Sequence, residues 1–218
     1  MARYLEIKDY FDFCLKKDSF CKNGSYPVST IYYDTPALEF FHDKVNGEYI
    51  HKKARLRTYG ETMFEGPTFF EIKAKSNEDQ IKKRIKLEKR MSLMDIPDFA
   101  SFKDSEISQQ LEGYSLVPVS HVKYDREAYF LGEGDGQLRV NFDKNISISE
   151  VNESHRFETL VFPDQRILLE VKMPFRGTNQ IINSFLSLCQ EQRTTFSKYA
   201  TGMNLISSNY AMETPNEL

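Results

Sequence analysis

The chain has 218 residues, of which 40% are hydrophobic and 28% are charged. This length and composition predict a single domain over residues 1–218 with a substantial core. The formal net charge of −3 argues against a generally basic nucleic-acid-binding protein. We find neither a run of about 18 apolar residues nor a signal-peptide pattern. We therefore expect no intrinsic membrane segment and a cytoplasmic location.

The first predicted element is a helix at the start of the chain. Apolar side chains recur there at helical spacing, namely Tyr4, Ile7, Phe11, Cys14 and Leu15. The alternative is a strand over residues 4–8, in which Glu6 and Lys8 would share a face with Tyr4. We favour the helix.

Seven segments alternate polar and apolar residues with the period of a β-strand. They are residues 26–35, 50–60, 67–75, 80–90, 118–130, 137–149 and 166–175. Turn signals such as Asn46-Gly47 and Pro163-Asp164 separate them. Together with helices, these strands predict an α+β protein.

Two more helices are predicted beside the strands. One begins at residues 34–36, where Pro36 suits a first turn, and ends at Gly47, with Leu38, Phe41 and Val45 as its buried face. The other is capped by Thr178, and its apolar stripe consists of Ile181, Ile182, Phe185, Leu186 and Cys189. We expect both to cover a sheet.

The polar faces of the predicted strands are unusually basic. Because successive strand residues point to opposite sides, these faces hold Lys53, Arg55, Arg57, Lys73, Lys75, Lys82, Arg84, Lys86, Arg126, Arg139 and Lys172, with the acidic residues Glu71, Glu88, Asp143 and Glu170. These polar faces thus hold eleven basic residues and only four acidic ones, although the net charge of the chain is negative. Ordinary solvent-exposed faces mix the two signs more evenly.

Two interpretations of these faces remain open. An antiparallel sheet often leaves a charged face in water. Alternatively, the basic face turns inward, and the repulsion among its charges is relieved by a polyanionic ligand. Phosphate chains suit this second case, since Arg binds phosphate oxygens through two N–H groups and Lys supplies a mobile charge. A nucleic acid would also need exposed aromatic platforms.

Other kinds of site lack a signature in the sequence. His42, His51, His121 and His155 do not have the spacing of metal ligands, and neither do Cys14, Cys21 and Cys189, which we expect to be reduced thiols. There is no G-x-x-x-x-G-K-[ST] loop for nucleotide phosphates. Phosphate recognition would therefore depend on side chains.

The same segments resemble the VTC domain, a branch of the triphosphate tunnel metalloenzymes. The resemblance rests on short motifs in a fixed order over roughly residues 26 to 205: YPVSTIYYDTP, DKVNG, KARLRTYG, FFEIKAK, KKRIKLE, VKYDREAYF, LRVNFDKNI, ILLEVKM and FSKYATGMN. It implies an antiparallel β-barrel tunnel with flanking helices. Members of this family usually begin with a further strand, which here is either missing or replaced by residues 4–8.

The resemblance also implies roles for individual residues. The catalytic set that binds the reacting phosphates is Arg55, Arg57, Lys73, Arg84, Arg126 and Lys198. Further substrate-binding residues are Tyr124, Arg139, Lys172 and Ser197, to which the basic faces add Lys53, Lys75, Lys82 and Lys86. Glu170 matches the metal-binding carboxylate, which implies Mn²⁺ or Mg²⁺. Considered alone, Glu170 also suits a salt bridge, and Tyr124 suits packing.

The function implied is metal-dependent phosphoryl transfer on phosphate chains, foremost polyphosphate synthesis from ATP. Hydrolysis of tripolyphosphate or a nucleoside triphosphate is one alternative. A non-catalytic polyphosphate-binding module is another. The expected partners are ATP or another triphosphate and polyphosphate, without nucleic acid.

Overall fold

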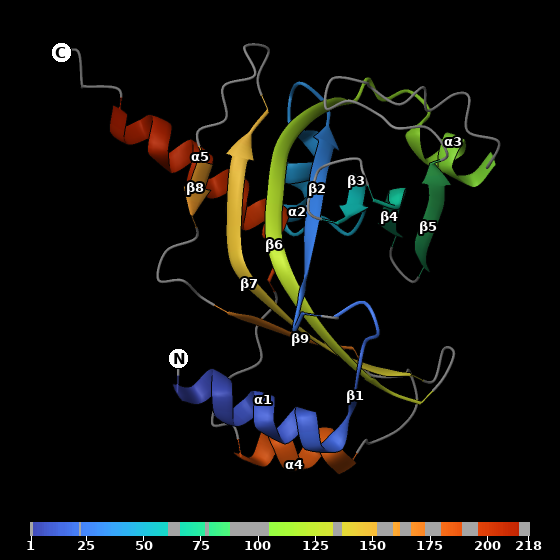
Figure 1. Cartoon of the computed structure of the whole chain (residues 1–218). Helices are drawn as coiled ribbons and strands as arrows, with labels where there is room; N and C mark the ends of the chain where they lie inside the picture. Colours follow the sequence, from blue (N-terminus) through green and yellow to red (C-terminus); the bar gives the residue numbers. More distant parts are fainter. Residues whose placement is uncertain are drawn as a thin grey trace. The chain divides into compact units, whose positions relative to one another are not determined.

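The computed structural model describes residues 2–21, 23–60, 66–76, 79–87, 105–132, 137–151, 159–161, 167–172, 180–188 and 196–213 (Figure 1). The chain forms two compact units. Unit 1 comprises Met1–Tyr26, Tyr124–Ile146 and Pro163–Phe196, and unit 2 comprises Pro27–Lys123, Ser147–Phe162 and Ser197–Leu218. Each unit is described by itself, and the single domain expected from the sequence stays a prediction.

The secondary structure confirms an α+β fold. The helices are α1 Ala2–Cys14, α2 Glu39–Asn46, α3 Ser105–Leu111, α4 Gln180–Leu188 and α5 Lys198–Glu213. The strands are β1 Lys16–Lys17, β2 Tyr26–Asp34, β3 His51–Tyr59, β4 Thr68–Ser76, β5 Asp79–Leu87, β6 Val117–Leu131, β7 Leu138–Glu150, β8 Thr159–Val161 and β9 Leu168–Lys172. All seven predicted strands are present; α3, α5, β1 and β8 were not predicted.

Two long strands, β6 and β7, contribute residues to both units. Unit 2 has the order β5-β4-β3-β2-β6-β7-β8, and in unit 1 β1 pairs with β6 and β9 pairs with β7. The pairs β1–β6, β2–β3, β3–β4, β4–β5, β7–β8 and β7–β9 are all antiparallel. Such a sheet with flanking helices is consistent with a tunnel fold.

The core of unit 2 lies on one face of its sheet. It consists of Ile31, Tyr33, Phe40, Ala54, Leu56, Phe70, Ile72, Ile107, Leu111 and Leu116, with residues of α2 and α3 packed on the strands. Because side chains alternate along a strand, burying these residues turns the basic ones to the other face. The sequence pattern therefore fixes which face of unit 2 is charged.

Helix α2 differs from its prediction. It begins at Glu39 because Leu38 adopts a left-handed conformation, with φ 55°. Phe40 and Phe41 form its buried face, so the predicted burial of Phe41 is confirmed, whereas Val45 is 51% exposed and its predicted burial is wrong. Its end at Gly47 is confirmed, since Gly47 has φ 75° and glycine adopts this conformation without strain.

The core of unit 1 lies between the sheet and two helices. Figure 1 shows α1 beside α4, and Phe11 packs on Phe185 with ring centroids 4.8 Å apart. Tyr4, Ile7, Cys14 and Leu15 join this core, as the helical stripe predicts. Residues 4–8 are therefore helical, and the alternative strand, with Glu6 and Lys8 in place of a first tunnel strand, is wrong.

The apolar stripe predicted for the helix after Thr178 is confirmed for the side chains that the structure describes. Ile181 and Phe185 of α4 pack in the unit 1 core. Thr178, Cys189 and the side chains of Ile182 and Leu186 lie outside the described residues. None of the helices in the described ranges is long and apolar enough to cross a membrane.

Candidate functional site

Three arginines surround one carboxylate on the polar face of unit 2. The Cα register aligns Arg55, Glu71 and Arg84 across β3, β4 and β5. Glu71 Oε2 lies 2.6 Å from Nη2 of Arg55 and 3.5 Å from Nη1 of Arg57. Its Oε1 lies 3.5 Å from Nε of Arg84. We call these four residues the Glu71 cluster.

The Glu71 cluster retains an excess of positive charge. Glu71 is 7% exposed. Burial alone would raise its pKa, but the charges of Arg55, Arg57 and Arg84 outweigh burial and lower it. The carboxylate therefore stays ionised and balances one of three guanidinium charges. A partly buried surface with unbalanced cations favours an anionic ligand.

Arg84 is held in place by aromatic rings although its side chain is 44% exposed. Its guanidinium carbon lies 3.5 Å from the ring centroid of Phe69 and 5.7 Å from that of Tyr59. Burial would raise the pKa of Tyr59, but Arg57 and Arg84 lower it. Stacking of this kind leaves guanidinium N–H groups free to bind an anion.

A row of lysines adjoins the Glu71 cluster. The register aligns Lys53, Lys73 and Lys82 across β3, β4 and β5, and we call these residues the lysine row. Burial lowers the pKa of Lys73, and nearby Lys82, Arg55, Lys44 and Lys75 lower it further. Burial is likewise the main reason that the pKa of Lys53 is lowered.

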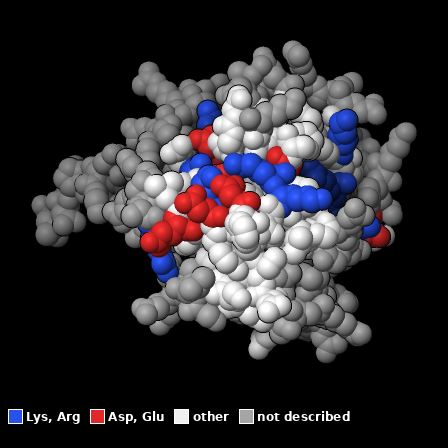
Figure 2. Space-filling view, turned by 60° about the horizontal axis from the view of Figure 1, so that its bottom comes forward, with Lys and Arg blue, Asp and Glu red and all other residues white. Residues whose placement is uncertain are grey.

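Within the described ranges, no carboxylate forms an ion pair with a member of the lysine row. Lys75 and Lys86 are exposed on the same face of β4 and β5. Figure 2 shows Lys and Arg side chains gathered on one face of the molecule, beside Asp and Glu side chains. The lysine row therefore adds positive charge that an anion would neutralise. The sequence prediction missed Lys44, which lies on a helix rather than on an alternating strand.

Ser197 and Lys198 are fixed by the start of α5. The Ser197 hydroxyl accepts hydrogen bonds from the Ala200 N–H at 3.3 Å and from Lys53 Nζ at 2.9 Å. The hydroxyl of Tyr199 donates to the fully buried Asp34 carboxylate, which also accepts from Phe40 N–H. This anchor, at the start of α5, holds Ser197 beside Lys53. The sequence prediction missed Tyr199 and assigned residue 34 only to a helix start.

A second charged group, in unit 1, centres on Arg126. Its Nε and Nη2 donate to both oxygens of Asp143, at 2.7 and 2.8 Å. Nη2 also lies 3.6 Å from Glu170 Oε2, and Glu170 Oε1 lies 3.2 Å from Lys172 Nζ. We call Arg126, Asn141, Asp143, Glu170 and Lys172 the Arg126 cluster. Burial would lower the pKa of Arg126, but Tyr124, Asp143 and Glu170 raise it, so its charge is secure.

The remaining predicted residues of unit 1 lie around this cluster. Tyr124 is buried, and the guanidinium carbon of Arg126 lies 5.1 Å from its ring centroid. Arg139 pairs in register with Lys172, and its Nη2 lies 3.5 Å from Asp18. Glu170 therefore still suits both a salt bridge and a metal ligand, since it forms ion pairs and its carboxylate oxygens could also bind a cation.

The donor atoms near Glu170 suit a hard cation that is shared with a substrate. Asn141 is fully buried, its Nδ2 donates to Glu170 Oε2 at 3.4 Å, and its Oδ1 accepts no hydrogen bond in the described part of the chain. No set of three or more His, Cys, Asp or Glu residues able to hold a metal occurs among the described residues. The side-chain oxygens of Glu170 and Asn141 are of the kind that Mg²⁺ or Mn²⁺ binds together with phosphates and water.

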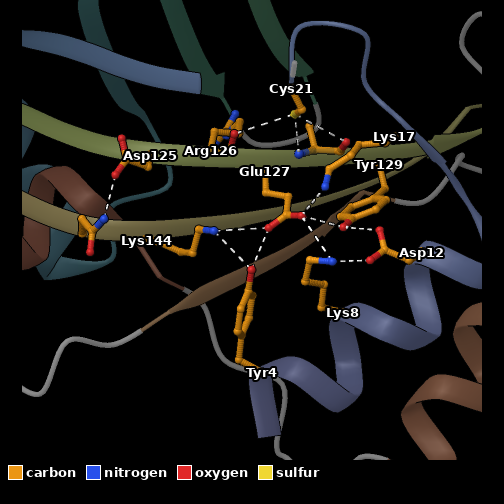
Figure 3. Close-up of polar contacts among 12 residues, drawn as sticks. Tyr4, Lys8, Asp12, Lys17, Cys21, Asp125, Arg126, Glu127, Tyr129 and Lys144 are labelled. Carbon is orange, nitrogen blue, oxygen red and sulfur yellow. Dashed lines mark hydrogen bonds and ion pairs between the residues drawn. The ribbon is translucent and has the colours of Figure 1, made fainter. Parts of the chain in front are cut away.

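Glu127, adjacent to Arg126 in sequence, connects several elements of unit 1. Figure 3 shows Tyr4, Lys17, Tyr129 and Lys144 pointing toward its carboxylate. The Tyr4 and Tyr129 hydroxyls and Lys17 Nζ each lie 2.7 Å from it. Although burial raises the pKa of Glu127, bonds from Lys17, Tyr4 and Tyr129 lower it to about 2. Tyr129 is two residues further along β6, whereas Tyr4, Lys17 and Lys144 come from α1, β1 and β7, so alternation on β6 could not reveal them.

His121 has a structural role rather than a metal-binding one. It is buried in unit 2, and its Nε2 lies 2.6 Å from the Ser29 hydroxyl. Burial, with a smaller contribution from Lys123, lowers its pKa to about 4. His42 is exposed in the middle of α2, His51 is half-buried at the start of β3, and His155 lies outside the described residues. Cys21 is buried and free, in agreement with its prediction as a reduced thiol.

These features define the class of the protein: an α+β protein whose antiparallel sheet presents a basic face. A family model described as VTC domain matches residues 1–207, and the chain belongs to the VTC domain family. This family is associated with polyphosphate polymerases and tunnel enzymes. A search of curated proteins returns no match.

Proposed function

We propose that this protein is a metal-dependent phosphotransferase that synthesises polyphosphate from ATP. The observation that carries the proposal is the charge on the polar face of unit 2. Three arginines share one carboxylate there, and the lysine row beside them has no acidic partner among the described residues. A chain of phosphates supplies regularly spaced negative charge to neutralise both groups.

The Glu71 cluster would bind the phosphates that react. Arg55, Arg57 and Arg84 each present N–H groups in a planar arrangement that matches phosphate oxygens. Because they are held by Glu71 and by aromatic rings before substrate binds, little reorganisation accompanies the reaction. Phosphoryl transfer needs this alignment and charge neutralisation more than covalent help from the protein.

In the proposed reaction, a terminal oxygen of polyphosphate attacks the γ-phosphorus of ATP. A new P–O bond forms, the bond from the γ-phosphorus to the β–γ bridging oxygen breaks, and ADP leaves with that electron pair. Lys73, Lys53 and Lys198 would neutralise the chain on either side of the reacting phosphate. Arg126 would contribute through Nη1, which takes no part in its contacts with Asp143 and Glu170.

Glu170 would hold the Mn²⁺ or Mg²⁺ ion, together with Asn141 Oδ1 and oxygens of the substrate. Such an ion would neutralise charge that develops on the phosphate oxygens. Asp143 would keep Arg126 oriented beside Glu170 through its two hydrogen bonds.

Product analysis after incubation with ATP and Mn²⁺ tests this proposal. We expect phosphate chains longer than the substrate on a sizing gel, and we expect Arg57→Ala and Glu170→Ala to abolish them. Lys83→Ala is the matched control, because Lys83 lies on β5 next to Arg84 but pairs with Glu106 at 2.8 Å. Orthophosphate as the product would assign the protein as a triphosphatase. Tight binding without turnover would assign it as a binding module. Unchanged turnover in both site variants would refute the site.

A further inference from the structure

Tyr32 lies on the basic face of unit 2, although neither the sequence pattern nor the resemblance marks it. The β2–β3 register pairs Tyr32 with Arg55, so the two side chains project from the same face of the sheet. Its neighbours Ile31 and Tyr33 belong to the core on the opposite face. Only 3% of Tyr32 is exposed.

The ring of Tyr32 has a fixed position. It stacks on Tyr199 with ring centroids 5.0 Å apart and an interplanar angle of 22°. The Tyr199 hydroxyl donates to Asp34, and burial together with that carboxylate raises the pKa of Tyr199, so this anchor stays protonated. Lys53 Nζ lies 6.0 Å from the Tyr32 ring centroid on this face.

The surroundings of the Tyr32 hydroxyl are strongly positive. Burial would raise the pKa of this phenol, yet the charges of Arg55, Lys53, Arg57 and Lys198 outweigh burial and lower it. No hydrogen bond to the hydroxyl is found within the described part of the chain. The hydroxyl is therefore a donor with a defined position, surrounded by cations and without a protein acceptor.

We propose that Tyr32 is a ligand of the phosphate chain, and that its hydroxyl donates a hydrogen bond to a phosphate oxygen bound by Arg55 and Lys53. This inference rests on the proposed function, since it requires a phosphate chain on the basic face. An anion there would supply the acceptor that the phenol lacks. It would also neutralise the cations around the ring.

The first test is binding of tripolyphosphate to Tyr32→Phe, measured by titration calorimetry in metal-free buffer. This variant keeps the stacked ring and removes only the hydroxyl. We expect affinity to fall about tenfold, the usual effect of one hydrogen bond to a charged group. Tyr33→Phe, next along β2 but in the core, is the matched control and should bind within about twofold of the unchanged protein.

Arg57→Ala separates failure of this inference from failure of the proposed function. If Arg57→Ala weakens binding and Tyr32→Phe does not, Tyr32 is not a ligand and the basic face still is. If neither variant changes tripolyphosphate affinity, both proposals fall.

Phenol absorbance gives a second, independent test, because the protein contains 12 tyrosines and no tryptophan. In a spectrophotometric pH titration, Tyr32→Phe should lose one of the phenols whose pKa is lowered, a group that also includes Tyr59. Tripolyphosphate should move that ionisation to higher pH in the unchanged protein, since the bound anion opposes a second negative charge. An ionisation that stays at the same pH when tripolyphosphate binds would overturn the assignment.

Discussion

Glu71 stays ionised inside the sheet because three guanidinium groups lie around it. Strand alternation correctly predicted that Arg55, Glu71 and Arg84 all lie on the polar face of the sheet. Alternation could not show which residues stand opposite one another, because pairing depends on register between strands. Tyr32 was missed for a related reason, since its neighbour Tyr33 is equally apolar and only the structure shows which one faces the basic side.

Glu71→Gln tests the charge balance of the Glu71 cluster. Removing the carboxylate leaves Arg55, Arg57 and Arg84 to repel one another, and we expect the free energy of unfolding to fall by about 2–4 kcal/mol in phosphate-free buffer. Tripolyphosphate should restore more stability to this variant than it adds to the unchanged protein. Urea unfolding with and without tripolyphosphate measures both effects.

Glu106→Gln is the control for that experiment, since Glu106 forms an exposed pair with Lys83. We expect it to change stability by about 0.5 kcal/mol or less. Equal stability and an equal tripolyphosphate response in Glu71→Gln and the unchanged protein would show that Glu71 does not restrain the arginines.

His121 makes stability depend on pH. Its pKa is about 4 in the folded protein against an ordinary value of 6.5, so the unfolded chain binds the proton more readily. The contribution of the neutral His121 ring to the free energy of unfolding is therefore complete above about pH 6.5 and is lost as the pH falls toward 4. The shift corresponds to a loss of about 3 kcal/mol at most. His121→Gln should flatten this part of the urea-unfolding profile between pH 7 and 4, and a profile parallel to that of the unchanged protein would exclude His121 as its source.

At the scale of elements, the strands were predictable and two of the helices were not. The seven predicted strands alternate polar and apolar residues with a period of two, and in β3, β4 and β5 the polar face is basic. Helix α5 has the sequence KYATGMNLISSNYAME, in which small and polar residues obscure any apolar stripe. Helix α2 starts later than predicted because the Asp34 carboxylate accepts N–H groups from Phe40 and Phe41, six and seven residues further on.

Glu127 is expected to secure α1 to the sheet of unit 1. In Glu127→Gln the hydroxyl of Tyr4 and the charges of Lys17 and Lys144 lose their carboxylate partner. We expect a loss of about 2–4 kcal/mol at neutral pH. Hydrogen exchange should quicken in α1 before it does so in unit 2.

The pH dependence of Glu127→Gln has a defined sign. Because the pKa of Glu127 is lowered to about 2 from its ordinary value of 4.5, its contribution is complete above pH 4.5 and is lost as the pH falls through 2. The stability gap between the two proteins should therefore narrow in acid. Glu6→Gln, at an exposed pair with Arg3, should show no gap at any pH. Equal exchange in α1 for all three proteins would contradict the role assigned to Glu127.

For the molecule as a whole, charge distribution matters more than net charge. The chain is negative overall, at −3, yet unit 2 carries an excess of basic side chains on one sheet face. The sequence predicted this face, and the family match covers residues 1–207. The sequence pattern could not predict the hydrogen bonds between Arg126 and Asp143, because these residues lie 17 positions apart on different strands. The reaction, the metal and the roles of the individual residues stay predictions.

Binding of tripolyphosphate to the basic face tests the central claim most directly. The double variant Arg57→Ala/Arg84→Ala keeps the close pair of Arg55 and Glu71 and should therefore fold. Titration calorimetry should show binding that weakens as salt rises and that falls about a hundredfold in the double variant. Lys83→Ala, on the opposite face of β5, should bind normally. Tripolyphosphate affinity that is the same in the double variant as in the unchanged protein would contradict the account.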